Sequence, residues 1–236
     1  MKALISFIAL ILLLGALVLF WGEYGVQQPD SQEDAVFVPS STEETLIDEK
    51  TTAYEVTGKL PPSDAFASAA ARAEMESQIT VFIEDAEAEL RTHETDPRYP
   101  WRPYVLDITY EMYETDVYVS YVINAYYYTG GANGTQTINT FVFDKNREAV
   151  SLTYLVPESA RAALLAAIHT KLYEINGIEP GEEGVFASAI AELRFDDLDT
   201  FYITNDSLVF GFSEYHVGPG ALGAIRVEIP RVALAQ

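Results

Sequence analysis

The chain has 236 residues, with 36 Asp and Glu against 14 Lys and Arg, which gives a formal net charge of -22. Neutralising the phosphates of a nucleic acid needs clustered Lys and Arg, so this balance excludes a nucleic acid partner. The chain has no cysteine, which excludes disulfides, thiol nucleophiles and lipoprotein attachment. Its 49% hydrophobic and 12% aromatic content predicts a folded domain with a core instead of a disordered acidic tail.

An apolar segment from Ala3 to Trp21 comes first. As a helix it would be roughly 28 Å long, close to the ~30 Å hydrocarbon core of a bilayer. Lys2 precedes it and no Lys or Arg follows until Lys50, an asymmetry that leaves the N-terminus inside. A cleaved signal peptide is the alternative, but its apolar core is usually shorter and a small-x-small cleavage site follows it. We therefore predict a single-pass transmembrane signal anchor at residues 1–22, with the rest of the chain outside the cytoplasm.

Residues 23–52 are predicted to form a flexible acidic stalk, because they hold few apolar residues and show no sustained period. A short strand is predicted at Tyr54. Ser63 or Asp64 is expected to cap a helix that ends before Pro97. Its apolar stripe keeps largely helical spacing and consists of Phe66, Ala69, Ala70, Ala73, Ile79, Phe82, Ile83, Ala86 and Leu90.

The middle of the chain is rich in strand patterns. Alternation and β-branched or aromatic content predict strands over residues 104–112, 117–128 and 136–143. The turn at 114–116 and the glycine-rich loop at 129–134 make these strands an antiparallel meander. The tyrosines of the second strand suit a glycan platform, although aromatic side chains on strands more often serve core and cross-strand packing.

The last part of the chain returns to helices and then to strands. The patterns predict helices over residues 157–175 and 185–193, followed by strands over 201–204, 208–212 and 225–229. The elements together predict an α+β fold, an antiparallel β-sheet packed with helices. We divide it into two intimately packed halves, an N-terminal half at residues 53–145 and a C-terminal half at 146–236.

Motifs that carry chemistry are weak in this sequence. The histidines His93, His169 and His216 lie far apart, and the acidic run at residues 196–199 lacks the pattern of a calcium-binding loop. The Gly-rich segment at 218–223 precedes a strand where a phosphate loop would precede a helix. We therefore predict no metal, no cofactor and no catalytic residue. The sequence leaves open whether two carboxylates form a pair suited to glycoside hydrolysis, because the distance between them cannot be read from sequence.

Two ordered motifs carry a family resemblance. The first runs YYYTGGANG at residues 126–134, then NTFVFD at 139–144 and VSLTYL at 150–155. The second runs FYITNDSLVF at 201–210, then YHVGP at 215–219 and VEIP at 227–230. In order and spacing they resemble the bacterial extracytoplasmic domain of RsiV-type anti-sigma factors that sense lysozyme, a domain also found beside peptidoglycan deacetylase domains.

The resemblance covers about residues 54–230. It implies an α+β domain in two halves, a place in the cell envelope and a recognition role. In the sensor that it resembles, the domain binds lysozyme itself.

Two loops, at residues 129–134 and 215–223, are the candidate contact surfaces, because loops on a rigid sheet are common binding positions. Their glycines could equally serve turn geometry. The candidate ligand-binding residues are Thr129, Gly130, Gly131, Asn133, Tyr215, His216, Pro219 and Gly223.

We predict non-catalytic recognition of a cell-wall glycan or of a cationic wall-active protein such as lysozyme. The negative charge would steer a cationic partner, although solubility alone also explains it. The alternatives are a cell-wall hydrolase or deacylase that uses surface carboxylates, and a structural subunit of an envelope complex.

Overall fold

The computed structural model describes residues 44–95 and 100–231, which belong to one compact unit. The predicted transmembrane segment at residues 1–22 lies outside these residues, and so does most of the predicted stalk. Over the two described ranges, no helix is both long enough and apolar enough to cross a bilayer.

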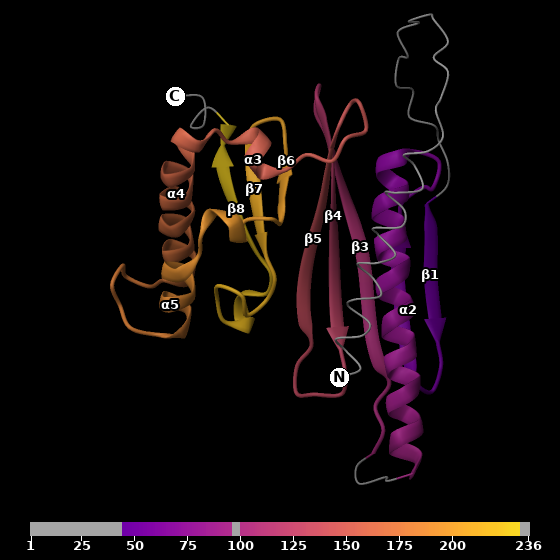
Figure 1. Ribbon diagram of the computed structural model, residues 1–236. Helices are drawn as coiled ribbons and strands as arrows, with labels where there is room; N and C mark the ends of the chain where they lie inside the picture. Colours follow the sequence, from indigo (N-terminus) through magenta and orange to yellow (C-terminus); the bar gives the residue numbers. More distant parts are fainter. Residues whose placement is uncertain (1–43, 96–99, 232–236) are drawn as a thin grey trace, which may run out of the picture. The chain divides into compact units, whose positions relative to one another are not determined.

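Five strands form the first sheet, in the order β1-β2-β3-β4-β5 (Figure 1). They are β1 (Thr45–Lys50), β2 (Tyr54–Leu60), β3 (Tyr104–Glu114), β4 (Tyr118–Tyr128) and β5 (Thr135–Asp144). The antiparallel meander of β3, β4 and β5 is confirmed. The prediction of a wholly antiparallel sheet was wrong, because β2 pairs with β3 in parallel. A long helix connects these two strands, and a crossover of this length is what parallel neighbours need.

Strand β1 corrects the predicted stalk, because it occupies residues that we expected to be flexible. It pairs antiparallel with β2 at the edge of the sheet. Ile47 is half-buried, and every other residue of the strand is exposed. Main-chain hydrogen bonds hold an edge strand even where few side chains are buried. The hydrophobic pattern of the sequence was therefore too weak to reveal it.

Helix α2 (Phe66–Thr95) confirms the predicted helix and runs along the first sheet (Figure 1). It contacts β2, β3, β4 and β5. Its buried residues recur at helical spacing: Ser68, Ala71, Met75, Phe82 and Ala86. The four apolar ones share a core with sheet residues that include Val56, Leu106, Ile108, Tyr121, Ile123 and Ala125.

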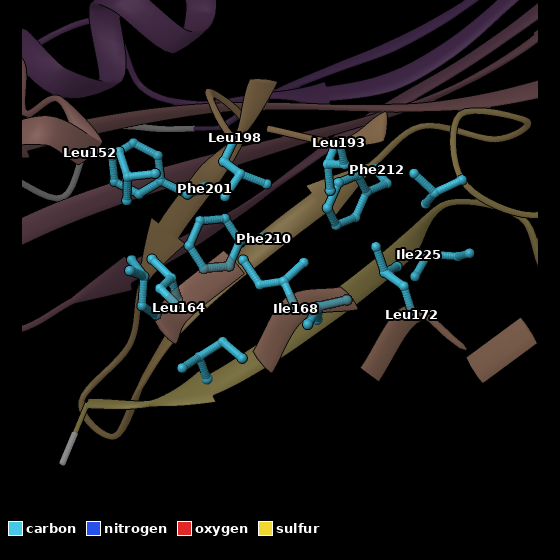
Figure 2. Packing of buried hydrophobic residues seen from close by; sticks show 14 of the residues in the cluster. Leu152, Leu164, Ile168, Leu172, Leu193, Leu198, Phe201, Phe210, Phe212 and Ile225 are labelled. Atoms are coloured by element: carbon cyan, nitrogen blue, oxygen red, sulfur yellow. The ribbon is translucent and has the colours of Figure 1, made fainter. Parts of the chain in front are cut away.

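The second sheet is antiparallel and contains β6 (Phe201–Ile203), β7 (Ser207–Phe212) and β8 (Ile225–Pro230), in that order. Helix α4 (Glu158–Asn176) packs on it through β8. Gly177 ends this helix with a φ of 64°, a left-handed conformation that glycine adopts without strain. Figure 2 shows Leu164, Ile168 and Leu172 of α4 beside the phenylalanines of β6 and β7.

Shorter helical elements complete this part of the chain. They are α3 (Leu152–Leu155), α5 (Val185–Glu192), the 3-10 helix η1 (Phe195–Asp197) and the 3-10 helix η2 (Gly220–Leu222). Helix α5 packs against α4 and buries Ala187 and Ile190.

The two sheets contact each other directly. Val122 of β4 and Ile138 of β5 pack against Tyr202 of β6 and Val209 of β7. The hydroxyl of Ser120, which is fully buried, accepts a hydrogen bond from the Ile203 amide at 3.0 Å. We call these residues, Ser120, Val122, Ile138, Tyr202, Ile203 and Val209, the buried centre. Because α2 covers the opposite face, the first half of β4 is buried on both faces.

Candidate functional site

The first candidate loop joins β4 to β5. Its predicted ligand-binding residues are all exposed: Thr129, Gly130, Gly131 and Asn133. Gly130 has a φ of 86°, in the left-handed region that favours glycine. At the end of the loop, Gly134 lies against the ring of Tyr126, and a Cβ at this position would overlap that ring. The absence of a side chain at Gly134 therefore leaves room for the Tyr126 ring, which is 37% exposed.

The second candidate loop joins β7 to β8. Tyr215 has a φ of 66° and is 52% exposed, so a bulky ring stands on left-handed backbone. Its hydroxyl lies where a side chain at Gly220 would be. His216 is exposed and its ring meets Phe212 edge to face, with centroids 5.8 Å apart. Pro219 is exposed and directly precedes η2.

Gln136 joins the bases of the two loops. Its amide donates to Glu214 Oε2 at 2.7 Å, and its carbonyl accepts from the Glu214 amide at 2.9 Å. Its side-chain Oε1 accepts from the Ala224 amide at 3.2 Å. Gly223 has a φ of 63°, and a Cβ there would lie 2.6 Å from the same Oε1. We call residues 129–136 and 213–224 together the loop edge.

The structure therefore brings the two predicted loops to neighbouring positions, through contacts that the sequence did not reveal. Backbone geometry accounts for Gly130 and Gly223, since both have positive φ. Thr129 has a second environment, because it also lines a groove formed with α2. The exposed rings of Tyr126 and Tyr215 are the largest side chains of this region that are free to meet a partner.

A polar cluster lies beside the buried centre and also links the two sheets. Arg226 of β8 forms a bidentate pair with Glu111 of β3, with Nη2 to Oε1 at 2.5 Å and Nη1 to Oε2 at 3.0 Å. Asn124 of β4 donates to Glu111 Oε1 at 2.9 Å and accepts from Arg226 at 2.8 Å. The hydroxyl of Tyr113 donates to Glu111 Oε2 at 2.5 Å. We call Glu111, Tyr113, Asn124 and Arg226 the polar rim.

The polar rim has a strong electrostatic signature. The hydrogen bonds from Arg226 lower the pKa of Glu111 from 4.5 to about 2, despite the opposing effect of its burial. Burial and the bond to this carboxylate raise the pKa of Tyr113. Tyr113 also stacks on Tyr202, with centroids 4.9 Å apart. Because each side chain of the polar rim forms a hydrogen bond with another, the arrangement suits a structural link between the two sheets.

A groove of about 620 Å³ lies on the other side of the first sheet, between α2 and the ends of β3 and β4. Its lining residues are Ser77, Gln78, Val81, Phe82, Asp85, Ala88, Glu89, Thr92, Tyr104, Tyr127 and Thr129. We call it the acidic groove, because Asp85 and Glu89 are its charged lining residues.

Aromatic rings pack together along the acidic groove. The Phe82 centroid lies 6.2 Å from that of Tyr104 and 6.1 Å from that of Tyr127. Trp101 stacks on Tyr104 at 5.6 Å. The pKa of Tyr104 is raised by burial first and then by the charges of Glu89 and Asp85, so the negative field reaches the ring.

Residues 44–95 and 100–231 hold no group of three or more His, Asp or Glu placed to bind a metal ion. His169 lies 3.2 Å from the Leu193 carbonyl through Nε2. In the acidic run, Asp197 accepts from the Arg194 amide at 2.8 Å and so caps η1.

Sequence reasoning missed Gln136, the polar rim and the acidic groove. A partial signal existed for the groove, since Gln78, Phe82, Asp85 and Glu89 recur at spacings of three and four beside the buried stripe of α2. No local pattern pairs Glu111 with Arg226, because they lie 115 positions apart.

Family models match two separate parts of the chain. Residues 47–136 match the family described as Deacetylase PdaC, and residues 155–232 match a family described as a protein of unknown function, DUF3298. The first match covers β1 to β4 together with α2, and the second covers α4 to β8. No curated protein matches the chain.

Two solved structures of DUF3298 family proteins have a similar fold. The one from Bacteroides fragilis has a TM-score of 0.59 and 18% identity, over 82% of this chain and 91% of that chain. The one from Pseudomonas aeruginosa has a TM-score of 0.56 and 14% identity, over 84% of this chain and 94% of that chain. The chain therefore shares the fold of DUF3298 family proteins. Along the chain, the part that matches PdaC precedes the part that matches DUF3298.

Proposed function

We propose that the chain is a membrane-anchored envelope protein whose domain outside the cytoplasm recognises a cationic wall-active protein, such as lysozyme, without catalysis of its own. The loop edge carries this proposal, because it presents two exposed loops from two different sheets. Gln136 holds their bases together by hydrogen bonds to Glu214 and Ala224. Loops fixed in this way on a rigid scaffold are common sites of protein recognition.

Charge and exposed aromatic area support a protein partner. The formal net charge of -22 would attract a cationic protein and raise its association rate. Tyr215 offers a large ring in the second loop, and tyrosine is one of the residues that most often contribute binding energy at interfaces. The resemblance to RsiV-type domains and the apolar N-terminal segment support the proposed partner and location.

A cell-wall glycan is the second candidate ligand, favoured by the Tyr126 ring. This ring lies beside Gly134, and part of it is exposed. An exposed aromatic ring suits contact with a sugar ring, because its apolar face can bury the C–H groups of the sugar.

The test is binding of the full chain, in non-ionic detergent, to c-type lysozyme and to purified peptidoglycan over a salt titration. Tyr215→Asn removes the ring, and asparagine tolerates the positive φ. We expect this variant to weaken lysozyme binding by about tenfold, as for a central interface aromatic. Tyr154→Asn is the matched control, because Tyr154 is 78% exposed on α3, outside the loop edge.

Each outcome decides between the candidates. Equal loss for both variants, or collapse of binding at modest salt, would reduce the interaction to charge attraction and contradict the proposal. Binding to peptidoglycan without binding to lysozyme would favour the glycan. Because the name of the matched PdaC family describes a deacetylase, released acetate and sugar are measured too, and either product would overturn the non-catalytic assignment.

A further inference from the structure

We propose that the acidic groove is a second binding site, which shares only Thr129 with the loop edge, and that it takes a lysine or arginine side chain from an extended segment of a basic protein. Its volume of about 620 Å³ lies within the ~300 to ~1,000 Å³ of typical ligand sites. That space exceeds a single side chain and suits a short stretch of peptide.

The charges of the groove favour a cationic occupant. Asp85 and Glu89 are one helical turn apart on α2, so both carboxylates lie on the same face. The described residues that line the groove include no lysine or arginine. The two carboxylates are exposed, and they therefore remain available to a cation from outside.

The rings of the groove match the rest of such a side chain. A lysine or arginine carries an apolar stem that packs on aromatic surface while its charged end stays near carboxylates. Phe82, Tyr104 and Tyr127 supply that surface beside Asp85 and Glu89. A cation near tyrosine rings is also attracted to their electron-rich faces.

One neighbouring contact makes the site measurable. Trp101 stacks on Tyr104 with an interplanar angle of 17°, so its fluorescence reports on the ring that lines the groove. The chain has two tryptophans, Trp21 and Trp101. Trp21→Phe therefore leaves Trp101 as the single tryptophan reporter in the full chain.

The experiment titrates the Trp21→Phe chain with pentalysine and follows Trp101 emission, with calorimetry as a second measurement. We expect saturable binding, and none for a pentalysine whose ammonium groups are acetylated. Asp85→Asn with Glu89→Gln should weaken the binding of pentalysine by about tenfold, since two carboxylate contacts are lost.

The matched control is Glu84→Gln with Glu94→Gln. It changes the net charge equally, on exposed positions of the same helix that do not line the groove. We expect this control to alter the affinity less than twofold. Equal weakening by both double variants, or no saturable binding by either method, would overturn the proposal. Tyr215→Asn should leave pentalysine binding unchanged, so that failure of this site and failure of the loop edge are told apart.

Discussion

The buried centre and the polar rim both join the two sheets, but they do so by different physics. In the buried centre, Val122, Ile138, Tyr202 and Val209 are at most 3% exposed. In the polar rim, the side chains of Arg226 and Glu111 are 32% and 38% exposed. The buried centre therefore stabilises the fold by removing apolar surface from water. Each contact of the polar rim stabilises the fold less, but its directed hydrogen bonds fix the orientation of the two sheets.

This difference matters for the loop edge. Its two loops come from different sheets, and their distance depends on how those sheets are held. We expect perturbation of the buried centre to lower the free energy of unfolding of the whole domain. Perturbation of the polar rim should cost less, and its cost should depend on pH.

The largest effect is expected from Tyr202→Ala. The change removes a ring that is 3% exposed and that stacks on Tyr113. Truncating a buried aromatic residue costs about 3 to 5 kcal/mol, and we expect a loss of at least about 3 kcal/mol here. Urea unfolding measures it, with Tyr154→Ala as the exposed control. A decrease of the free energy of unfolding below about 1 kcal/mol would show that the buried centre does not hold the two sheets together.

Ser120→Ala should have the next largest effect. The Ser120 hydroxyl accepts from the Ile203 amide at 3.0 Å, and its loss leaves that buried amide without this acceptor. An unsatisfied buried donor costs about 1 to 3 kcal/mol. The same unfolding experiment on Ser188→Ala, at an exposed position of α5, should show little change. Similar values for the two variants would contradict the role given to Ser120.

A smaller and pH-dependent effect is expected from Arg226→Met. Arg226 lowers the pKa of Glu111 to about 2, so the pair stabilises the fold above pH about 4.5. This contribution is lost as pH falls from about 4.5 toward 2, because protonation then favours the unfolded chain. Solvent screening limits it to about 1 to 2 kcal/mol, since both side chains are about one-third exposed.

Unfolding of the Arg226→Met variant between pH 6 and pH 2 measures this effect. The variant should lose stability at pH 6 and show a shallower decline toward low pH than the unchanged chain. Lys50→Met is the matched control, because it breaks the exposed pair of Lys50 with Glu55 at 2.6 Å. It should change stability by less than about 0.5 kcal/mol at either pH. Parallel pH profiles for Arg226→Met and the unchanged chain would contradict the assignment.

The sequence predicted local elements well and long-range contacts poorly. The meander of β3, β4 and β5 was predictable because alternation of apolar residues is a local property. The parallel pairing of β2 with β3 was not, because α2 separates the two strands along the chain. β1 was missed because its exposed side chains carry no burial pattern.

In the candidate sites, too, local features were predictable from the sequence and long-range contacts were not. The two loops could be found from their glycines, which mark left-handed backbone at Gly130 and Gly223. Gln136 carries no such mark, although it holds the loops together. The acidic groove needs α2 to lie beside Tyr104 and Tyr127, and no spacing in the sequence gives that contact.

The smallest effect on global stability is expected from Glu214→Ala, which acts on the loop edge itself. Glu214 Oε2 accepts from the Gln136 amide at 2.7 Å, on an exposed part of the molecule. Water replaces a lost acceptor at such a position, so the free energy of unfolding should fall by less than about 1 kcal/mol. Hydrogen exchange at the Gln136 amide should nevertheless become faster, because this amide loses its protein acceptor. Glu228→Ala, which also removes an acidic side chain but at an exposed position of β8, should leave that exchange rate unaltered. If the Gln136 amide is protected equally in both variants, the carboxylate of Glu214 does not hold the loops together, and the backbone contact from the Glu214 amide to the Gln136 carbonyl suffices.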